Sequence, residues 1–204
     1  MLTLLGYTLP ELARLQIELE YRLTSDGLLI PREGSVERNR CCLYLHAAGM
    51  DAYFRSDVPA SARRAVARLA PQTVLAAPEL VSERLGGTAA GRYETYLVLE
   101  PFPAASCGEA RLVDGKAVIE GPDRRAVSWA WSVRESDRAA ECAVETVESF
   151  RRRGFASRVT ATWANRTLAA GKVPFYSHSA GNDASRALAV RLGLEHVFTV
   201  FGIA

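Results

Sequence analysis

The chain has 204 residues, of which 49% are hydrophobic and 24% charged, so it can bury a proper core as one large domain or two small ones. Its 25 basic and 23 acidic residues leave a net charge of +2, which argues against a nucleic-acid partner. No segment approaches the roughly 18 to 20 apolar residues of a membrane span, and the first residues lack the basic flank of a signal peptide. We therefore expect a soluble cytoplasmic protein that binds neither membranes nor nucleic acids.

The four cysteines are at positions 41, 42, 107 and 142 and form no C-x-x-C pair. This spacing is not typical of a metal site, and we expect no bound metal. Cys41 and Cys42 would point to opposite faces of a strand. We interpret the cysteines as ordinary reduced thiols in the core or at a sheet edge.

In the first 90 residues the pattern predicts helices joined by one hairpin. Apolar residues among charged ones favour a helix over 9–22, which begins after Pro10. A hairpin is expected over 41–54, with its turn near Ala48 and Gly49. Further helices are expected from Pro59 to about Leu69 and over 78–85. We interpret residues 1–90 as an N-terminal helix and hairpin subdomain of unknown role.

From Arg92 onward the apolar residues alternate as they do in strands. Strands are predicted from residue 92 to about 99 and over 110–113, 117–120, 126–134 and 141–147. A helix over 157–170, a strand over 173–178, a second helix and a final strand over 195–203 follow. We expect the α+β class: a mixed, mostly antiparallel central sheet flanked by helices, with a β-α-β-α-β C-terminal part.

A basic turn punctuated by glycine joins the predicted strand 141–147 to the helix after it. Its sequence is Arg151-Arg152-Arg153-Gly154-Phe155-Ala156-Ser157. Backbone N–H groups at such a turn can converge on a phosphate. Cations at a helix N-terminus oppose the helix dipole, so three arginines in a row favour an anionic partner. The alternative is a solvated basic helix start in which Gly154 serves a tight turn.

A second informative segment runs from Asn182 to Leu194, and Asn182 is predicted to cap the helix that it opens. Arg151-x-x-Gly154-x-Ala156 resembles the signature of the GNAT superfamily of N-acetyltransferases, and the Asn182 to Leu194 segment is similar to the later Asn…Leu-Gly-Phe segment of that superfamily. The resemblance covers roughly the last 80 residues. It implies that residues 91–204 form an acetyl-CoA-binding acetyltransferase domain.

The resemblance implies a cofactor site on the strand, the turn and the later helix. The pantetheine arm of coenzyme A would pair with the strand near Thr146 and Val147. The pyrophosphate would lie on the turn, where Gly154 and Ala156 allow close approach. The cofactor-binding residues expected in this way are Thr146, Val147, Arg151, Arg152, Arg153, Gly154, Phe155, Ala156, Ser157, Asn182 and Ser185. Ala184, Leu188 and Leu192 are expected to face the core.

The implied reaction needs a base that deprotonates the acceptor amine. The candidates are Glu145, Glu141 and His178, and Glu145 is expected nearest the thioester if its face of the strand is the acceptor side. A solvated glutamate and a loop-capping histidine are the alternatives. A backbone N–H, that of Val147, would polarise the carbonyl oxygen.

One position departs from the superfamily pattern. Many members carry a Tyr just after the position of Leu188, where this chain has Ala189. Tyr176 is the candidate replacement as the acid that protonates the leaving thiolate, and a thiol with a pKa near 8.5 can also leave without an acid.

The leading hypothesis is an N-acetyltransferase that transfers the acetyl group of acetyl-CoA to a small-molecule or protein amine. The alternative is a non-catalytic acyl-CoA-binding module whose N-terminal half contacts a protein. The strand-rich end Val197–Phe201 is compatible with a homodimer and equally with an internal strand.

Overall fold

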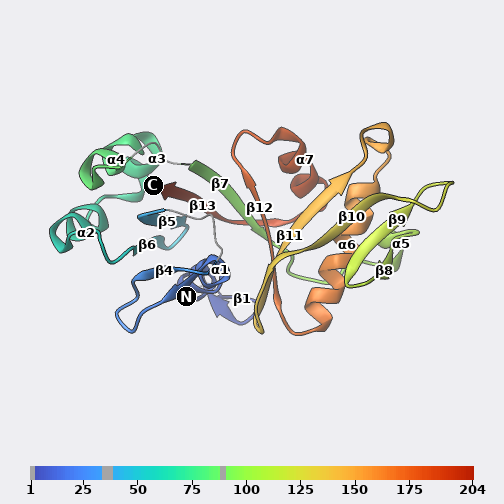
Figure 1. Cartoon of the computed structure of the whole chain (residues 1–204), viewed down its shortest axis with the longest axis horizontal. Coiled ribbons are helices and arrows are strands. Elements are labelled where there is room, and N and C mark those ends of the chain that lie inside the picture. Colours follow the sequence, from blue (N-terminus) through green and yellow to red (C-terminus); the bar gives the residue numbers. More distant parts are fainter. Residues whose placement is uncertain (1–2, 34–38, 88–90) are drawn as a thin grey trace. The chain divides into compact units, whose positions relative to one another are not determined.

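A computed structural model describes residues 3–33, 39–87 and 91–204 (Figure 1). The chain divides into two compact units, Met1–Thr95 with Val197–Ala204 and Tyr96–His196. Two strands, β7 (Gly91–Leu97) and β13 (Glu195–Ile203), cross from one unit to the other. The separate roles assigned from sequence to residues 1–90 and 91–204 stay predictions.

The first unit contains three antiparallel hairpins and four helices within its described residues. Its elements are β1 (Thr3–Leu4), β2 (Tyr7–Thr8), α1 (Leu9–Glu20), β3 (Tyr21–Leu23), β4 (Leu29–Pro31), β5 (Cys41–His46), β6 (Gly49–Phe54), α2 (Ala60–Ala67), α3 (Pro71–Ala76) and α4 (Glu79–Leu85). Helix α1 begins where Thr8 and Glu11 form a reciprocal capping box. The predicted helices and hairpin are confirmed, whereas α3 was not predicted because its six residues are too few to show a helical period.

The second unit holds most of the sheet. Its other elements are α5 (Ala104–Cys107), β8 (Arg111–Val113), β9 (Lys116–Glu120), β10 (Ala126–Glu135), β11 (Ala139–Thr146), the 3-10 turn η1 (Glu148–Phe150), α6 (Phe155–Ala169), β12 (Val173–Ser179) and α7 (Asp183–Arg191). Within this unit the strand order includes β12-β11-β10-β9-β8, in which only β11 and β12 run parallel. The predicted mixed, mostly antiparallel sheet with its β-α-β-α-β end is confirmed.

Helix α6 covers one face of this sheet, and its apolar side builds the core of the second unit. Trp163 is fully buried against residues such as Ala130 and Cys142, and its indole nitrogen donates to Ser132 Oγ at 3.1 Å. Residues 140, 142 and 144 of β11 pack on this side. Because side chains alternate along a strand, residues 141, 143 and 145 lie on the opposite face.

The pairing of β11 with β12 is short. It covers only the rungs Ala139↔Val173, Ala140↔Pro174 and Glu141↔Phe175, after which the strands separate. Figure 1 shows them diverging toward α7. At the same level β10 carries a bulge, because its register against β11 shifts between Ser132 and Arg134. A bulge bends its strand and increases the local twist, which turns β11 away from β12.

Removing the buried indole should test this core. We expect Trp163→Ala to lower the free energy of unfolding by about 3 to 5 kcal/mol, because a large cavity forms and Ser132 loses its donor. Val190→Ala on the exposed side of α7, where Val190 is 71% exposed, serves as control and should change it by less than about 1 kcal/mol. Urea unfolding of both variants measures the difference, and equal effects would contradict the assignment of this core.

Candidate functional site

A pocket of about 350 Å³ lies on the α6 and α7 side of the gap between the separated strands. This volume is within the range of ligand pockets. The lining residues come from the end of β11, the turn after it, the first turn of α6 and one side of α7. They are Val144, Thr146, Phe150, Arg151, Arg152, Gly154, Phe155, Ala156, Ser157, Ala184, Ser185, Ala187, Leu188 and Arg191.

The free edge of β11 supplies backbone hydrogen-bonding groups to this gap. Val147 N–H donates to Val127 O of the β10 side at 2.9 Å, so alternation turns the N–H and C=O of Val144 and Thr146 toward β12. The last paired rung between the strands is at Glu141, and both Val144 and Thr146 lie beyond it. An unpaired edge of this kind can accept an extended ligand as an additional strand.

Val147 itself is not placed as the sequence suggested. Its N–H is already used by Val127, and the residue is not among those that line the pocket. The prediction that this N–H polarises the thioester oxygen is therefore wrong. The sequence places the strand correctly, but which alternate residues face the gap depends on the register with β10, which the sequence did not show.

The turn before α6 has the geometry of an anion-binding loop. Arg152 has φ +62° and Gly154 has φ +79°, so two residues of the turn are left-handed. The left-handed region is rare for a residue with a side chain, and such strain is typical of functional turns. Helix α6 begins at Phe155, two residues earlier than predicted, so the N–H groups of its first turn lie at the pocket.

The arginines of the turn have different surroundings. Arg151 Nε donates to Thr146 O at 3.3 Å and still lines the pocket. Arg152 lines the pocket and has no hydrogen-bond or ion-pair partner within the described residues. Arg153 instead lies over the Phe150 ring at 5.0 Å and donates to Ser149 O, and it is not among the lining residues. Of the three predicted cationic donors, two therefore face the pocket.

Helix α7 forms the other wall. Asn182 caps it as predicted, because its side-chain oxygen accepts from Ser185 N at 3.0 Å. Asn182 does not line the pocket, whereas Ser185 does. Ala184 and Leu188 were expected to face the core, and both line the pocket. Leu188 also packs against the core as predicted, whereas Ala184 is exposed. The fully buried residue of this helix is Ala189.

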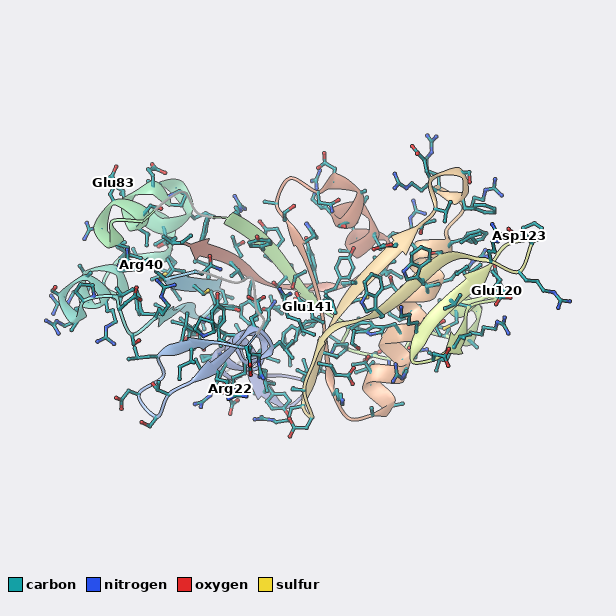
Figure 2. All side chains as sticks on the ribbon, in the orientation of Figure 1. Arg22, Arg40, Glu83, Glu120, Asp123 and Glu141 are labelled. Atoms are coloured by element: carbon teal, nitrogen blue, oxygen red, sulfur yellow. The ribbon has the colours of Figure 1, made fainter. Side chains whose placement is uncertain are left out.

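The two candidate carboxylates lie on the sheet face away from the pocket. Glu141 is at the last paired rung, where the gap begins, and Figure 2 labels it close to this point. Its side chain is buried, 5% exposed, and accepts from Arg134 Nη1 at 2.8 Å. Glu145 is exposed near the loop end of the strand. Glu141, and not Glu145, is therefore at the closed end of the gap.

His178 and Tyr176 lie side by side on β12. His178 Nδ1 is 2.8 Å from Ser179 O, and because a carbonyl only accepts, Nδ1 carries the proton. Nε2 is buried and has no partner within the described residues. The Tyr176 hydroxyl approaches Ser185 O at 3.4 Å, and burial raises the pKa of Tyr176 to about 12. Neither residue is among those that line the pocket.

The sequence did not single out Val144, Phe150, Ala187 or Arg191 as site residues, and the structure places them in the wall. A signal was present for α7. Ala184, Leu188 and Arg191 follow one another at helical spacing, so a ligand beside Ala184 would also face Arg191.

Comparisons with known proteins show which family part of the chain is similar to. Residues 115–200 match the family model described as GNAT acetyltransferase. That range contains both the turn at 151–157 and the segment at 182–194, so the predicted resemblance to the GNAT superfamily is confirmed. No curated protein matches the chain.

Several solved structures are similar to this chain at low identity. A GCN5-related N-acetyltransferase-like protein from Streptococcus suis is 15% identical, with 81% of this chain and 84% of that chain covered and a TM-score of 0.46. A GCN5-related N-acetyltransferase from Kribbella flavida is 21% identical, with 62% and 63% covered and a TM-score of 0.42. A GNAT-family acetyltransferase from Colwellia psychrerythraea is 8% identical, with 89% and 78% covered and a TM-score of 0.44.

No cluster of three or more His, Cys, Asp or Glu side chains in the described part of the chain is arranged to hold a metal ion. No helix in the described ranges is both long enough and apolar enough to cross a membrane.

The left-handed conformation of Gly154 gives a direct test of the turn. We expect Gly154→Ala to destabilise the protein by about 1 to 2 kcal/mol, because a Cβ is unfavourable at φ +79° although nothing lies within 4 Å of it. Gly181→Ala is the matched control, since its Cβ also meets nothing within 4 Å and its φ is not in that region. Thermal and urea unfolding should show a loss only at Gly154, and an equal loss in both variants would contradict the strained turn.

Proposed function

We propose that this protein is an N-acetyltransferase that transfers the acetyl group of acetyl-CoA to an amine by direct attack on the thioester. The observation that carries the proposal is the convergence, on one pocket, of a free strand edge, a left-handed turn and the start of α6. The match of residues 115–200 to the acetyltransferase family supports the same conclusion.

The free edge of β11 suits the pantetheine arm. The arm is extended and carries two amides, and Val144 and Thr146 offer N–H and C=O groups at strand spacing. Phe155 and Leu188 add apolar surface along the pocket for its methylene and methyl groups. The thioester would then lie deepest in the gap, toward Glu141.

The turn suits the pyrophosphate. The N–H groups at the start of α6 have no intrahelical partners and the helix dipole favours an anion there. Arg151 and Arg152 add two cations, and each charge-assisted hydrogen bond contributes roughly 1.5 to 3 kcal/mol. No acidic side chain is among the lining residues in the described part of the chain, so nothing in the wall repels the phosphates.

The acceptor ammonium loses one proton to a base before attack, and its nitrogen loses a second as the amide forms, which can pass to the departing sulfur. The amine nitrogen forms a bond to the thioester carbon, the C–S bond breaks, and the electron pair stays on sulfur. We propose Glu141 as the group that receives the amine proton, because it lies at the closed end of the gap, on the sheet face opposite the pocket. Arg134 Nη1 pairs with this carboxylate at 2.8 Å and fixes its direction.

The remaining candidates fit less well. The Glu145 side chain is exposed and distant from the last paired rung. A hydroxyl with a pKa of about 12 is a poor donor to a thiolate whose conjugate acid has a pKa of about 8.5, so Tyr176 is not favoured as the acid. His178 is the alternative base, because its Nε2 has no hydrogen-bond partner within the described residues.

Binding of acetyl-CoA tests the cofactor part of the proposal. We expect calorimetry to give a dissociation constant near 1 μM, about −8 kcal/mol, for the wild type. Arg152→Gln should weaken binding by about tenfold or more, because a cation of the pocket is lost. Arg153→Gln removes the neighbouring charge outside the wall and should change binding less than about threefold. Absence of binding to the folded wild type would refute the proposal.

Turnover tests the base and separates an enzyme from a binding module. With an amine found by screening, Glu141→Gln should lower kcat/KM by about 10² to 10⁴ and leave acetyl-CoA binding unchanged, since the amide keeps an acceptor for Arg134 and cannot take a proton. His178→Gln is the competing variant. If it abolishes turnover and Glu141→Gln does not, His178 is the base. Tight binding without turnover on any amine would favour the non-catalytic acyl-CoA-binding module.

A further inference from the structure

Arg191 is a third arginine that lines the pocket, and it comes from α7 and not from the turn. It lies in the last turn of α7, lines the pocket together with Arg151 and Arg152, and makes no hydrogen bond or ion pair with any other described residue. An exposed arginine is usually solvated, and a cation near a helix C-terminus is favourable by itself. The dipole does not explain why the side chain lies on the ligand side of the helix.

The neighbouring arginine of the same helix shows the contrast. Arg186 is exposed, pairs with Asp183 at 2.9 Å and does not line the pocket. Arg191 instead continues the row formed by Ala184 and Leu188, which is the side of α7 that faces the ligand. Seven residues of helix separate Ala184 from Arg191, a rise of about 10 Å. The pocket therefore has a cationic group at the far end of α7.

The charges of the proposed ligand match two separate cationic positions. The pyrophosphate carries about two negative charges, for which the turn offers Arg151, Arg152 and the α6 N–H groups. The ribose 3′-phosphate is a monoester with a further charge of about −1.5 to −2 at neutral pH. It is joined to the pyrophosphate through the ribose, so it cannot share the same donors and needs a cation from another element.

We propose that Arg191 binds the ribose 3′-phosphate of coenzyme A and is the residue by which this protein distinguishes coenzyme A from 3′-dephospho-coenzyme A. This inference rests on the proposed function, because it concerns the same pocket. Arg191 is a specificity-determining residue with no assigned part in acetyl transfer, since it lines the pocket with the arginines of the turn and lies on another element than Glu141.

The test is calorimetric titration of the full chain with coenzyme A and with 3′-dephospho-coenzyme A. We expect the wild type to bind coenzyme A about 10- to 100-fold more tightly than the dephospho form, the range of one lost charge-assisted contact. Arg191→Gln should weaken coenzyme A by that factor, leave the dephospho form unchanged, and so remove the discrimination. Arg191→Lys should retain part of it, because a point charge still attracts a phosphate. Arg186→Gln is the matched control on the same helix and should leave both affinities unchanged.

The outcomes separate this inference from the proposed function. If the wild type binds neither compound, the coenzyme A site itself is refuted. If the wild type binds coenzyme A and Arg191→Gln weakens both compounds equally, or neither, then Arg191 does not contact the 3′-phosphate and the inference is wrong. Unchanged thermal unfolding of Arg191→Gln confirms that any loss of discrimination does not arise from misfolding. A reduced slope of binding against salt in this variant, for coenzyme A alone, supports the assignment.

Discussion

The separation of β11 from β12 after Glu141 is the constraint on which the site depends. A parallel pair normally continues until both strands end, because unpaired backbone groups away from water are costly. Here β11 keeps its pairing with β10 up to Thr146 while its other edge opens. The bulge of β10 at this level allows the bend, and the core on Trp163 holds β11 to α6 on one side. An edge held open in this way is ready for a ligand that can complete it.

The turn that follows this edge of β11, and the start of α6 after it, form the next part of the pocket. Beyond Thr146 the chain must reverse within a few residues to begin α6, and it does so through left-handed Arg152 and Gly154. Gly154 adopts this conformation easily, whereas Arg152 is strained. With these conformations the turn brings the start of α6 to the gap. The backbone donors of the helix and the open edge of β11 therefore line one pocket. A relaxed turn would leave two separate binding features.

Much of this arrangement could be predicted from the sequence because it is local. The hydrophobic period gives α6 and the strands, Asn182 is an evident cap, and the glycine turn is recognisable from its residue types. The predictions that failed concern features that depend on strand register and on packing between distant segments. Val147 was assigned to the gap and faces β10, because one residue of register reverses the direction of every N–H. Ala184 was assigned to the core, because a small apolar residue looks the same in a core and in a ligand wall.

Glu141 has a part both in the packing of the sheet and in the proposed proton transfer. A buried carboxylate without a partner is strongly destabilising, so the ion pair with Arg134 is needed for folding whatever else the residue does. The same pair fixes the Glu141 carboxylate at the closed end of the gap, on the sheet face opposite the pocket. Cations line the pocket on one face of the sheet and this carboxylate lies on the other, so we expect the two proposed reactants on different faces. This separation of charge by strand alternation is what a reaction between a coenzyme A thioester and an ammonium acceptor requires.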